Sequence, residues 1–365
     1  MFASGGAGAK RVVFLGTPDV AAKSLEMLAA ASKTRNDFEV IAVVSQPPAP
    51  AGRNKKLTPS PVHKLAEELN LPLMTPESAK DEEFLSALEA LQPDLCITAA
   101  YGNFLPKRFL AIPKLGTLNI HPSLLPKYRG AAPVQRCLEA GEEDSGVSVA
   151  ETVLKMDAGP VVRQLTVKLS GDEKAPDFLM DMFVAGTEAL LSALPDYFAG
   201  TATKAAQDET KACPAPKLTV EEARLDFSSL GAQTAHNRVR AFASWPGTWS
   251  TFSLAGGEGE RVKIVTTVVL SAAPGSSAPT REVNLVKLPR PASSCLTAPV
   301  PSEALRVVCG DGSVLGVVEL LPPGKKAMAA RSFVNGLRGA ALSWTEPPAP
   351  ADSANEQQQQ QQQQQ

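Results

Sequence analysis

The first half of the chain alternates short apolar runs with segments in which apolar residues recur at helical spacing. The runs predict strands at residues 11–16, 39–45, 94–100, 116–121 and 147–154. The helical spacing predicts helices at residues 20–31, 61–70 and 81–91. Strands that alternate with helices are typical of a doubly wound, Rossmann-like α/β domain built on a parallel sheet.

The second half shows a different pattern. Residues 199–216 are small, polar and contain proline, which predicts a linker. Short helices are expected at 220–224 and 230–242, and strands at 249–254, 261–270, 304–309 and 313–321. Several short strands with glycine turns predict a small OB-like β-barrel. A stretch rich in Pro, Ser and Ala, residues 271–302, is expected to be an irregular excursion from it.

These patterns predict the domain organisation. An N-terminal extension (1–10) precedes the α/β domain (11–198), the linker (199–216), the C-terminal barrel (217–345) and a tail (346–365). The tail ends in polyglutamine, has nothing apolar to bury and is expected to be disordered. The total of 365 residues also favours two domains, because single cores rarely grow much beyond about 250 residues.

Composition narrows the class of protein. The formal net charge of -2 excludes a polycation, so any nucleic-acid contact must come from local patches. The 5 cysteines have no C-x-x-C spacing, which favours reduced thiols. No apolar run approaches the roughly 20 residues that span a bilayer, so no membrane partner is expected. The first ten residues are too short for a signal peptide, and no transit peptide is evident in this chain.

The densest group of reactive side chains lies in residues 118–133, LNIHPSLLPKYRGAAP. Asn119 and His121 are two positions apart on a predicted strand, so both point to the same face. Pro122 ends that strand, which places the pair at the carboxyl end of the sheet, where open α/β sheets bind ligands. An amide can donate to a developing oxyanion, and an imidazole can transfer a proton.

Asp157 follows the next predicted strand and opens a glycine turn. Its carboxylate could orient His121 and favour the charged imidazole. Taken singly, each residue has a structural explanation: Asn119 as a turn cap, His121 as a structural side chain and Asp157 as a turn former. Only their combination points to an active site.

The string NIHPSLLP, residues 119–126, resembles the signature of the folate-dependent formyltransferases, and Asn119, His121 and Asp157 match that family's active-site residues. Other motifs are similar to its methionyl-tRNA branch, of plant or algal organellar type: GTPD, AGRNKKLTPSPV, AYGNFLP, SLLPKYRGAAPVQR, KLTVEEARLDF, RAFASWPGTW and PPGKKAM. The resemblance extends from about residue 11 to 338. The chain departs from the bacterial pattern at Val20, Asn54 and Pro160.

The resemblance implies transfer of a formyl group from 10-formyltetrahydrofolate to the amino group of methionyl-initiator tRNA, with no metal. Asn119, His121 and Asp157 would be catalytic. The implied folate contacts are Tyr101, Gly102, Leu105, Ser123, Leu124, Leu125 and Pro126. The implied tRNA contacts are Arg53, Lys55, Lys56, Lys325 and Lys326.

Two segments, 53–64 and 320–345, contain four Lys or Arg each and neither Asp nor Glu. A solvated surface is the ordinary explanation for one such run. Two of them in a chain of net charge -2 favour contact with phosphates. Segment 53–64 contains prolines and directly follows Gly52. This composition predicts a mobile loop rather than a helix.

Three other functions fit parts of the sequence. A dinucleotide-binding oxidoreductase would need the G-x-G-x-x-G that Leu15-Gly16-Thr17-Pro18 lacks. A formyltransferase acting on a small amine, such as an amino sugar nucleotide or a ribonucleotide, would share the catalytic residues without needing the basic loop. An RNA-binding protein with a decayed catalytic domain is disfavoured, because Asn119, His121 and Asp157 are all intact. The resemblance and the polyglutamine tail favour a nucleus-encoded monomer of the chloroplast or mitochondrion.

Overall fold

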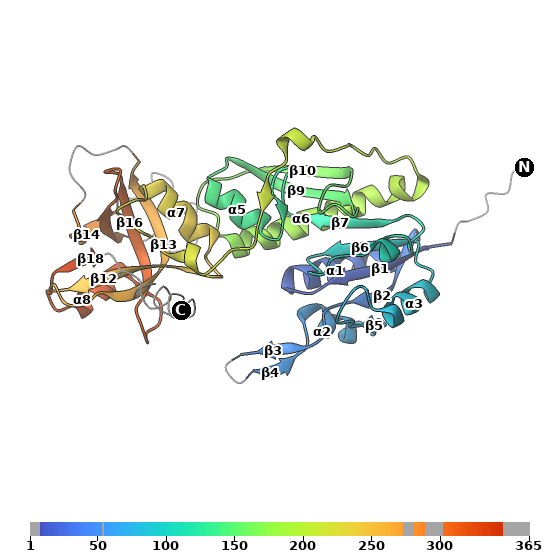
Figure 1. The fold of residues 1–365 in the computed structure, drawn as a ribbon, viewed down its shortest axis with the longest axis horizontal. Coiled ribbons are helices and arrows are strands. Elements are labelled where there is room, and N and C mark those ends of the chain that lie inside the picture. The colour runs from blue at the N-terminus through green and yellow to red at the C-terminus, as the bar shows by residue number, and fades with distance from the viewer. Residues whose placement is uncertain (1–7, 53–54, 273–279, 289–301, 346–365) are drawn as a thin grey trace, which may run out of the picture. The chain divides into compact units, whose positions relative to one another are not determined.

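The computed structural model describes residues 8–52, 55–272, 280–288 and 302–345. Several predicted features therefore lie outside the described residues. They are most of the expected N-terminal extension, Arg53, much of the expected excursion at 271–302 and the polyglutamine tail. The chain divides into two compact units, residues 1–217 and 218–365 (Figure 1). Each unit is described by itself.

The first unit is built on a seven-stranded sheet with the order β10-β9-β7-β6-β1-β2-β5. Its strands are β1 Lys10–Gly16, β2 Phe38–Val44, β5 Leu73–Met74, β6 Leu95–Ala99, β7 Thr117–His121, β9 Asp144–Glu151 and β10 Val161–Lys168. From β5 to β7 all neighbours are parallel, which confirms the expected α/β sheet. β9 instead runs antiparallel to β7, and β10 antiparallel to β9. The sheet is thus parallel except at this edge.

Helices cover both faces of this sheet (Figure 1). They are α1 Asp19–Thr34, α2 Pro61–Glu68, α3 Glu82–Ala90, α4 Lys107–Leu110, α5 Pro133–Ala140 and α6 Ala175–Ala199. α1 and α6 pack against each other and against the strands. On the other face, Phe84 and Leu88 of α3 and Phe109 of α4 are buried with Val13 and Leu15 of β1. Alternate residues of β1 therefore serve two cores, as a strand buried on both sides requires.

Gly186 allows α6 to lie directly on the strand that ends in His121. A Cβ at this position would come within 2.6 Å of the side chains of Ile120 and Val147. Real Cβ atoms do not approach carbon atoms so closely, so the helix and strand could not keep this spacing with a larger residue. The packing of α6 thus bears on the position of the strand that holds Asn119 and His121.

The length and composition of α6 alone would allow it to cross a membrane, but half of its most apolar window is buried inside the first unit. Phe178, Leu190 and Tyr197 are among its buried residues. Packing against β7, β9, β10 and α1 accounts for the apolar composition.

The hydrogen bond lost at a proline inside α6 is replaced by one from Arg35, the residue that follows α1. Pro195 has no N–H, so the carbonyl of Leu191, four residues earlier, lacks its helical donor. Nη1 of Arg35 donates to that carbonyl at 2.7 Å. Arg35 also pairs with Asp37 and lies over the ring of Phe38. The guanidinium therefore joins the end of α1 to the C-terminal turns of α6.

The basic segment near residue 53 is not a simple loop. β3 (Ala49–Ala51) and β4 (Lys56–Thr58) form a two-stranded hairpin, and α2 begins at Pro61. The expectation of a loop over residues 53–64 is therefore wrong for the described part of this segment. Three-residue strands are too short to show an alternating pattern, which explains why the sequence did not reveal the hairpin.

The second unit contains a strongly curled antiparallel sheet of order β14-β15-β16-β13-β12-β18, with β17 beside β16 (Figure 1). Its strands are β12 Thr248–Leu254, β13 Glu260–Ser271, β14 Asn284–Lys287, β15 Glu303–Val308, β16 Val314–Leu321, β17 Met328–Ala329 and β18 Leu342–Thr345. Its α-helices are α7 Ala232–Ala241 and α8 Ala330–Gly336. Strand β14 lies within the stretch that was expected to be irregular.

The two ends of this sheet meet. Glu282, just before β14, forms a bridge with Ser343 of β18, and the N–H of Val283 donates to the carbonyl of Leu342 at 2.9 Å. The sheet encloses a core that includes Phe227, Phe252 and Trp344. This curled sheet agrees with the expected small barrel.

Candidate active site

The order of the strands in the sheet reverses beside β1. The chain leaves β1 toward β2 and β5, then returns to β6 and β7 on the other side. Open α/β sheets bind ligands at the carboxyl ends of strands where the order reverses in this way. Thr17 follows β1, and its Oγ1 donates to the carbonyl of Tyr101, after β6, at 3.0 Å. Asn119 and His121 lie at the end of the next strand, β7.

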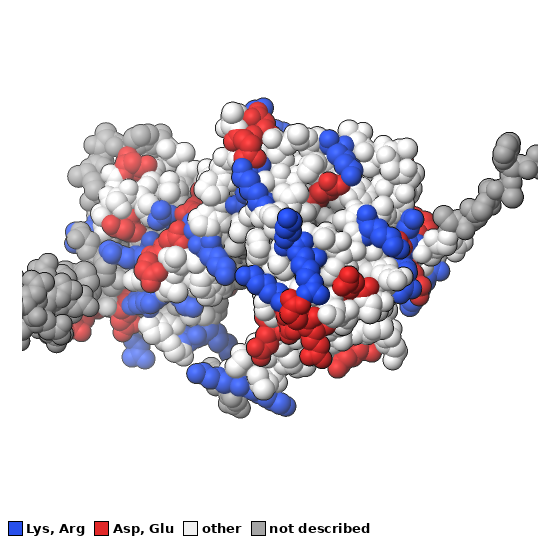
Figure 2. Space-filling view, turned by 45° about the vertical axis from the view of Figure 1, so that its right-hand side comes forward, with Lys and Arg blue, Asp and Glu red and all other residues white. Residues whose placement is uncertain are grey.

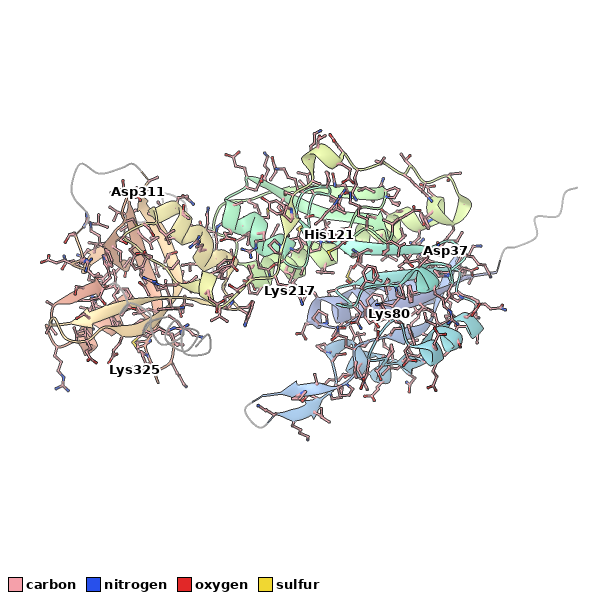
Figure 3. The ribbon with its side chains drawn as sticks, in the orientation of Figure 1. Asp37, Lys80, His121, Lys217, Asp311 and Lys325 are labelled. Atoms are coloured by element: carbon pink, nitrogen blue, oxygen red, sulfur yellow. The ribbon has the colours of Figure 1, made fainter. Side chains whose placement is uncertain are left out.

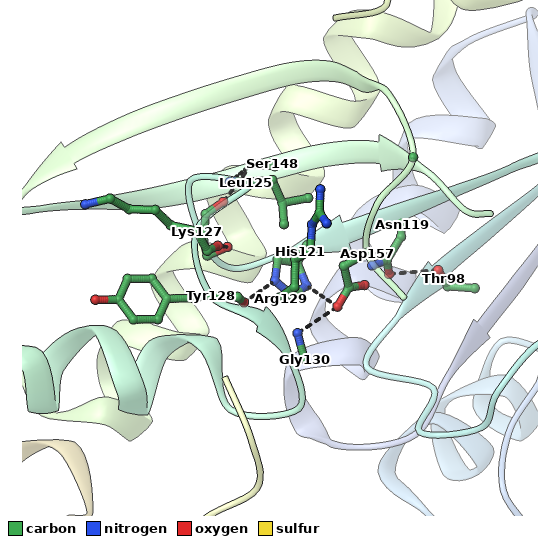
Figure 4. A network of polar contacts seen from close by, with 12 residues as sticks. Thr98, Asn119, His121, Leu125, Lys127, Tyr128, Arg129, Gly130, Ser148 and Asp157 are labelled. Carbon is green, nitrogen blue, oxygen red and sulfur yellow. Dashed lines mark hydrogen bonds and ion pairs between the residues drawn. The ribbon is translucent and has the colours of Figure 1, made fainter. Parts of the chain in front are cut away.

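The imidazole of His121 is held from one side. Its Nε2 lies 2.9 Å from the carbonyl oxygen of Tyr128 (Figure 4). A carbonyl can only accept, so this contact places a proton on Nε2. Nδ1 lies 3.8 Å from Oδ2 of Asp157, farther than a hydrogen bond. Nδ1 is therefore the ring nitrogen left available to a ligand, and protonating it would give a cation facing a carboxylate.

Asn119 is oriented by its neighbour on β6. Thr98 and Asn119 are partners in the parallel register of β6 and β7, and Thr98 Oγ1 donates to Asn119 Oδ1 at 2.8 Å (Figure 4). Since the amide oxygen is bound, the NH₂ end of Asn119 is the end presented to a ligand. Sequence reasoning did not identify Thr98, although a threonine in the apolar run LCITA was a usable signal.

Asp157 occupies a tight turn with a left-handed backbone, φ 49°. Its Oδ2 accepts from the N–H of Gly130 at 2.9 Å (Figure 4). Gly159 closes the turn and lies so near β9 that a Cβ there would come within 1.8 Å of the carbonyl oxygen of Glu151. The turn thus brings the third predicted residue to the other two, and all three converge at one sheet edge.

A residue that the sequence did not reveal supports this turn. Nε2 of Gln207 donates to the carbonyl of Asp157 and to that of Gly159, each at 2.7 Å. Oε1 of Gln207 accepts from Arg129. Gln207 comes from the expected linker, which packs back on the first unit: β11 (Pro214–Ala215) pairs with β8 (Arg129–Gly130). No local pattern signals a hydrogen bond between residues so far apart in sequence.

The residues predicted to contact folate fall into two segments, which differ in how many of their polar groups already have hydrogen-bond partners. In the first, Tyr101 and Leu105 are buried and Gly102 is exposed. Only the carbonyl of Tyr101 has hydrogen bonds from elsewhere in the described residues, from Thr17 and Gln46. The buried amide nitrogen of Asn103 has no partner in the described part of the chain. This loop therefore keeps main-chain and side-chain polar groups available for a ligand.

The second segment is fixed internally. The N–H of Leu125 donates to Ser148 Oγ, and its carbonyl accepts from Gln164. Ser123 is buried, and its carbonyl accepts from Ser148 Oγ. Leu124 and Pro126 are half-buried beside them. The main chain of Ser123 and Leu125 is thus largely occupied, so this segment offers a rigid apolar surface rather than free hydrogen-bonding groups.

The predicted tRNA-contact residues that are described lie on exposed turns of both units. Lys55 and Lys56 are exposed at the end of the β3–β4 hairpin. Lys325 and Lys326 are exposed in the turn between β16 and β17, at the surface of the second unit, whereas His121 lies inside the first (Figure 3). Arg331, counted in the second basic segment, pairs with Glu303. Over the face in Figure 2, basic and acidic side chains are interspersed, so local turns rather than a broad field supply positive charge.

Among the described residues, no group of three or more His, Cys, Asp or Glu side chains lies close enough to hold a metal ion. The polar groups that converge at the site are an amide, an imidazole and a carboxylate. Together they can stabilise a developing oxyanion and move a proton, which are the requirements of acyl transfer to an amine.

Comparison with known proteins defines the family. Residues 10–194 match the family model described as formyl transferase, and residues 217–338 match that of the formyl transferase C-terminal domain. The chain belongs to the formyl transferase family.

Solved structures share the fold at low identity. The sugar 3N-formyltransferase WlaRD, solved with dTDP and 5-N-formyl-THF, has a TM-score of 0.58 and 15% identity, over 88% of this chain and 100% of WlaRD. An N-formyltransferase from Helicobacter canadensis, solved with folinic acid and dTDP-3-aminofucose, has a TM-score of 0.56 and 14% identity, over 85% and 98%. HypX from Aquifex aeolicus has a TM-score of 0.54 and 19% identity, over 95% of this chain but only 52% of HypX. The chain thus spans about half the length of HypX.

Proposed function

We propose that this protein transfers the formyl group of 10-formyltetrahydrofolate to the amino group of methionyl-initiator tRNA. The amine nitrogen attacks the formyl carbon and gives a tetrahedral oxyanion. The C–N bond to the folate then breaks, the amine nitrogen loses a proton, and the departing folate nitrogen gains one. The products are the formylated amine and tetrahydrofolate.

The observation that carries the proposed formyl transfer, whichever amine accepts the group, is the convergence of Asn119, His121 and Asp157 at one edge of the sheet. The NH₂ of Asn119 and Nδ1–H of protonated His121 would stabilise the oxyanion. A water held by Asp157 would accept the proton of the amine, because a His121 that is protonated on both nitrogens cannot. Removing one oxyanion donor typically costs about a hundred- to thousandfold in rate.

The donor is proposed from the family and from the groups at the sheet edge beside β1. The loop at Tyr101 and Gly102 has unpaired polar groups, including Asn103 Nδ2, that could pair with the edge of a pterin. Leu105, Leu124 and Leu125 could pack against its flat face. Two of the similar structures were solved with a formyl-folate compound, which is consistent with this donor.

The acceptor is proposed from charge. Lys55 and Lys56 stand exposed on the hairpin of the first unit, and Lys325 and Lys326 on a turn of the second. Clustered lysines on exposed turns suit phosphate contacts, which supply most of the sequence-independent affinity for nucleic acid. Arg53, outside the described residues, would add a planar fork suited to phosphate and base edges.

A small amine is the alternative acceptor. The two sugar N-formyltransferases above share the fold, and their crystals held dTDP or a dTDP-amino sugar. Such a substrate would use the same catalytic residues but would not need exposed lysines on turns of both units.

One assay separates the two acceptors. Labelled 10-formyltetrahydrofolate is incubated with methionyl-initiator tRNA, a methionyl-elongator tRNA or a dTDP-amino sugar. Rapid transfer to the initiator tRNA alone supports the proposal. Transfer to the sugar alone would replace it by the small-amine reaction.

The hairpin is tested by salt dependence. Replacing Lys55 and Lys56 by Ala should weaken tRNA binding and flatten the plot of log affinity against log salt, by about one counterion per lost contact. Arg53→Ala should weaken formylation of tRNA and leave folate binding unchanged. Lys33→Ala, at an exposed position of α1, is a control that removes one positive charge away from the hairpin. An unchanged slope in the double variant would remove the hairpin from the tRNA site.

We further propose that the protein is a monomer of the chloroplast or mitochondrion, because formylated initiation belongs to bacteria and organelles. Immunoblots of purified organelles and light scattering of the pure protein test the two statements separately. Detection only outside both organelles, or a stable dimer, would contradict the corresponding statement.

A further inference from the structure

A closed ring of hydrogen bonds surrounds Asp157 and passes through Gln207. The N–H of Gly130 donates to the carboxylate of Asp157 at 2.9 Å. Arg129, the neighbour of Gly130, donates from Nε and Nη2 to Oε1 of Gln207 at 3.1 and 2.8 Å. Nε2 of Gln207 returns to the carbonyls of Asp157 and Gly159. Both ends of the Gln207 amide are therefore used.

This ring restrains a backbone conformation that is unfavourable by itself. Asp157 has φ 49°, in the left-handed region where residues other than glycine are uncommon. Such a conformation persists when its surroundings determine it. Gln207 holds the carbonyl of Asp157 while Gly130 holds the carboxylate, so the amide and the N–H together fix where the carboxylate faces His121.

Gln207 is itself held between two anchored points of its segment. On one side, Ala205 exchanges backbone hydrogen bonds with Val161 of β10, at 2.8 and 2.9 Å. On the other, the carbonyl of Cys213 accepts from the N–H of Arg129 at 2.9 Å, next to the β8–β11 pairing. The segment is therefore fixed to the same strands that surround the active site, and the Gln207 amide has a defined direction.

We propose that Gln207 is a positioning residue for formyl transfer, which holds the Asp157 turn so that the carboxylate faces His121. The inference rests on the proposed function, since it assigns Asp157 a role in the reaction. It does not depend on which amine is the acceptor.

The test uses Gln207→Glu. A carboxylate at this position has nearly the same shape and still accepts from Arg129, but it cannot donate to the two carbonyls. We expect kcat to fall about tenfold to a hundredfold, as small displacements of catalytic groups do, with KM for both substrates changed less than about threefold. Asp208→Asn is the matched control, because the exposed Asp208 side chain bonds to Thr210 in its own turn.

A double-mutant cycle with Asp157→Asn shows whether Gln207 acts through Asp157. If it does, Gln207→Glu should cost little further activity in the Asp157→Asn background. An equal loss in both backgrounds, or a normal kcat in the single variant, would overturn the proposal.

A measurement without turnover separates this proposal from the proposed function. Amide hydrogen exchange, followed by mass spectrometry, should be faster at residues 155–159 in Gln207→Glu and unchanged in Asp208→Asn. Unchanged exchange in both variants would refute the positioning role even if the wild-type protein transferred formyl groups to none of the tested amines.

Discussion

Nδ1 of His121 and Oδ2 of Asp157 face each other at 3.8 Å, a separation at which one ligand atom lying beside the pair can be within hydrogen-bonding distance of both. Two residues on different elements thus share one reaction space. His121 ends β7, whereas Asp157 belongs to the turn after β9. Charge on either residue should matter more for turnover than for folding.

We therefore expect Asn119→Ala, His121→Ala and Asp157→Asn each to lower kcat about a hundred- to thousandfold while the fold survives. Asp157→Asn keeps an oxygen that can accept from Gly130, so it isolates the loss of charge. Single-turnover formylation gives the rate, and circular dichroism checks the fold. A correctly folded His121→Ala protein with near-normal turnover would contradict this mechanism.

The packing of α6 predicts that replacing a helical glycine by alanine destabilises the protein, whereas this substitution usually stabilises a helix. In an open helix, Gly→Ala stabilises by about 1 kcal/mol through helix propensity. At Gly186 the new Cβ would meet Ile120 and Val147 at 2.6 Å, so we expect Gly186→Ala to destabilise by about 1–3 kcal/mol and to lower activity. Gly336→Ala in α8, where no atom lies within 4 Å, is the control and should not destabilise. Urea unfolding measures both, and equal effects would contradict the steric argument.

Features of the fold and of the site could be predicted where they depend on residues close together in the sequence, and not where they depend on distant ones. Alternation along β7 placed Asn119 and His121 on one face, and the proline after it placed them at a sheet edge. Strand direction has no signature in the apolar pattern, so the antiparallel pairing of β9 and β10 was not expected. Gln207 escaped prediction because its role depends on contacts with a turn that is distant in sequence.

Arg35 should stabilise the protein by donating to the carbonyl in α6 that Pro195 leaves without its helical donor. Arg35→Ala leaves the half-buried carbonyl of Leu191 without a donor, which we expect to lower the free energy of unfolding by about 1–2 kcal/mol. Lys33→Ala, an exposed neighbour, should change it by less than about 0.5 kcal/mol. Thermal melts of the two variants measure the difference. Identical melting temperatures would show that solvent replaces the guanidinium at this carbonyl.

The last prediction concerns acid stability near His121. Glu142 accepts from Lys127 and from the hydroxyl of Tyr128, the residue whose carbonyl bonds to His121. Burial raises the pKa of Glu142, but the bonds from Lys127 and Tyr128 outweigh this and the pKa is lowered overall. A carboxyl whose pKa is depressed by folding stabilises the protein above its unfolded pKa of about 4.3, and this contribution is lost as the pH falls through the folded value.

Glu142→Gln should therefore lower the free energy of unfolding at pH 7 by about 1 kcal/mol or less, because Lys127 is half exposed and solvent screens the pair. The difference from wild type should narrow as the pH falls below about 4.3, where the unfolded carboxyl is protonated. Urea midpoints at pH 7, 5 and 3.5 measure it, with the exposed Glu188→Gln as control. A difference that stayed constant over this range would mean that the charge of Glu142 does not stabilise the loop that holds His121.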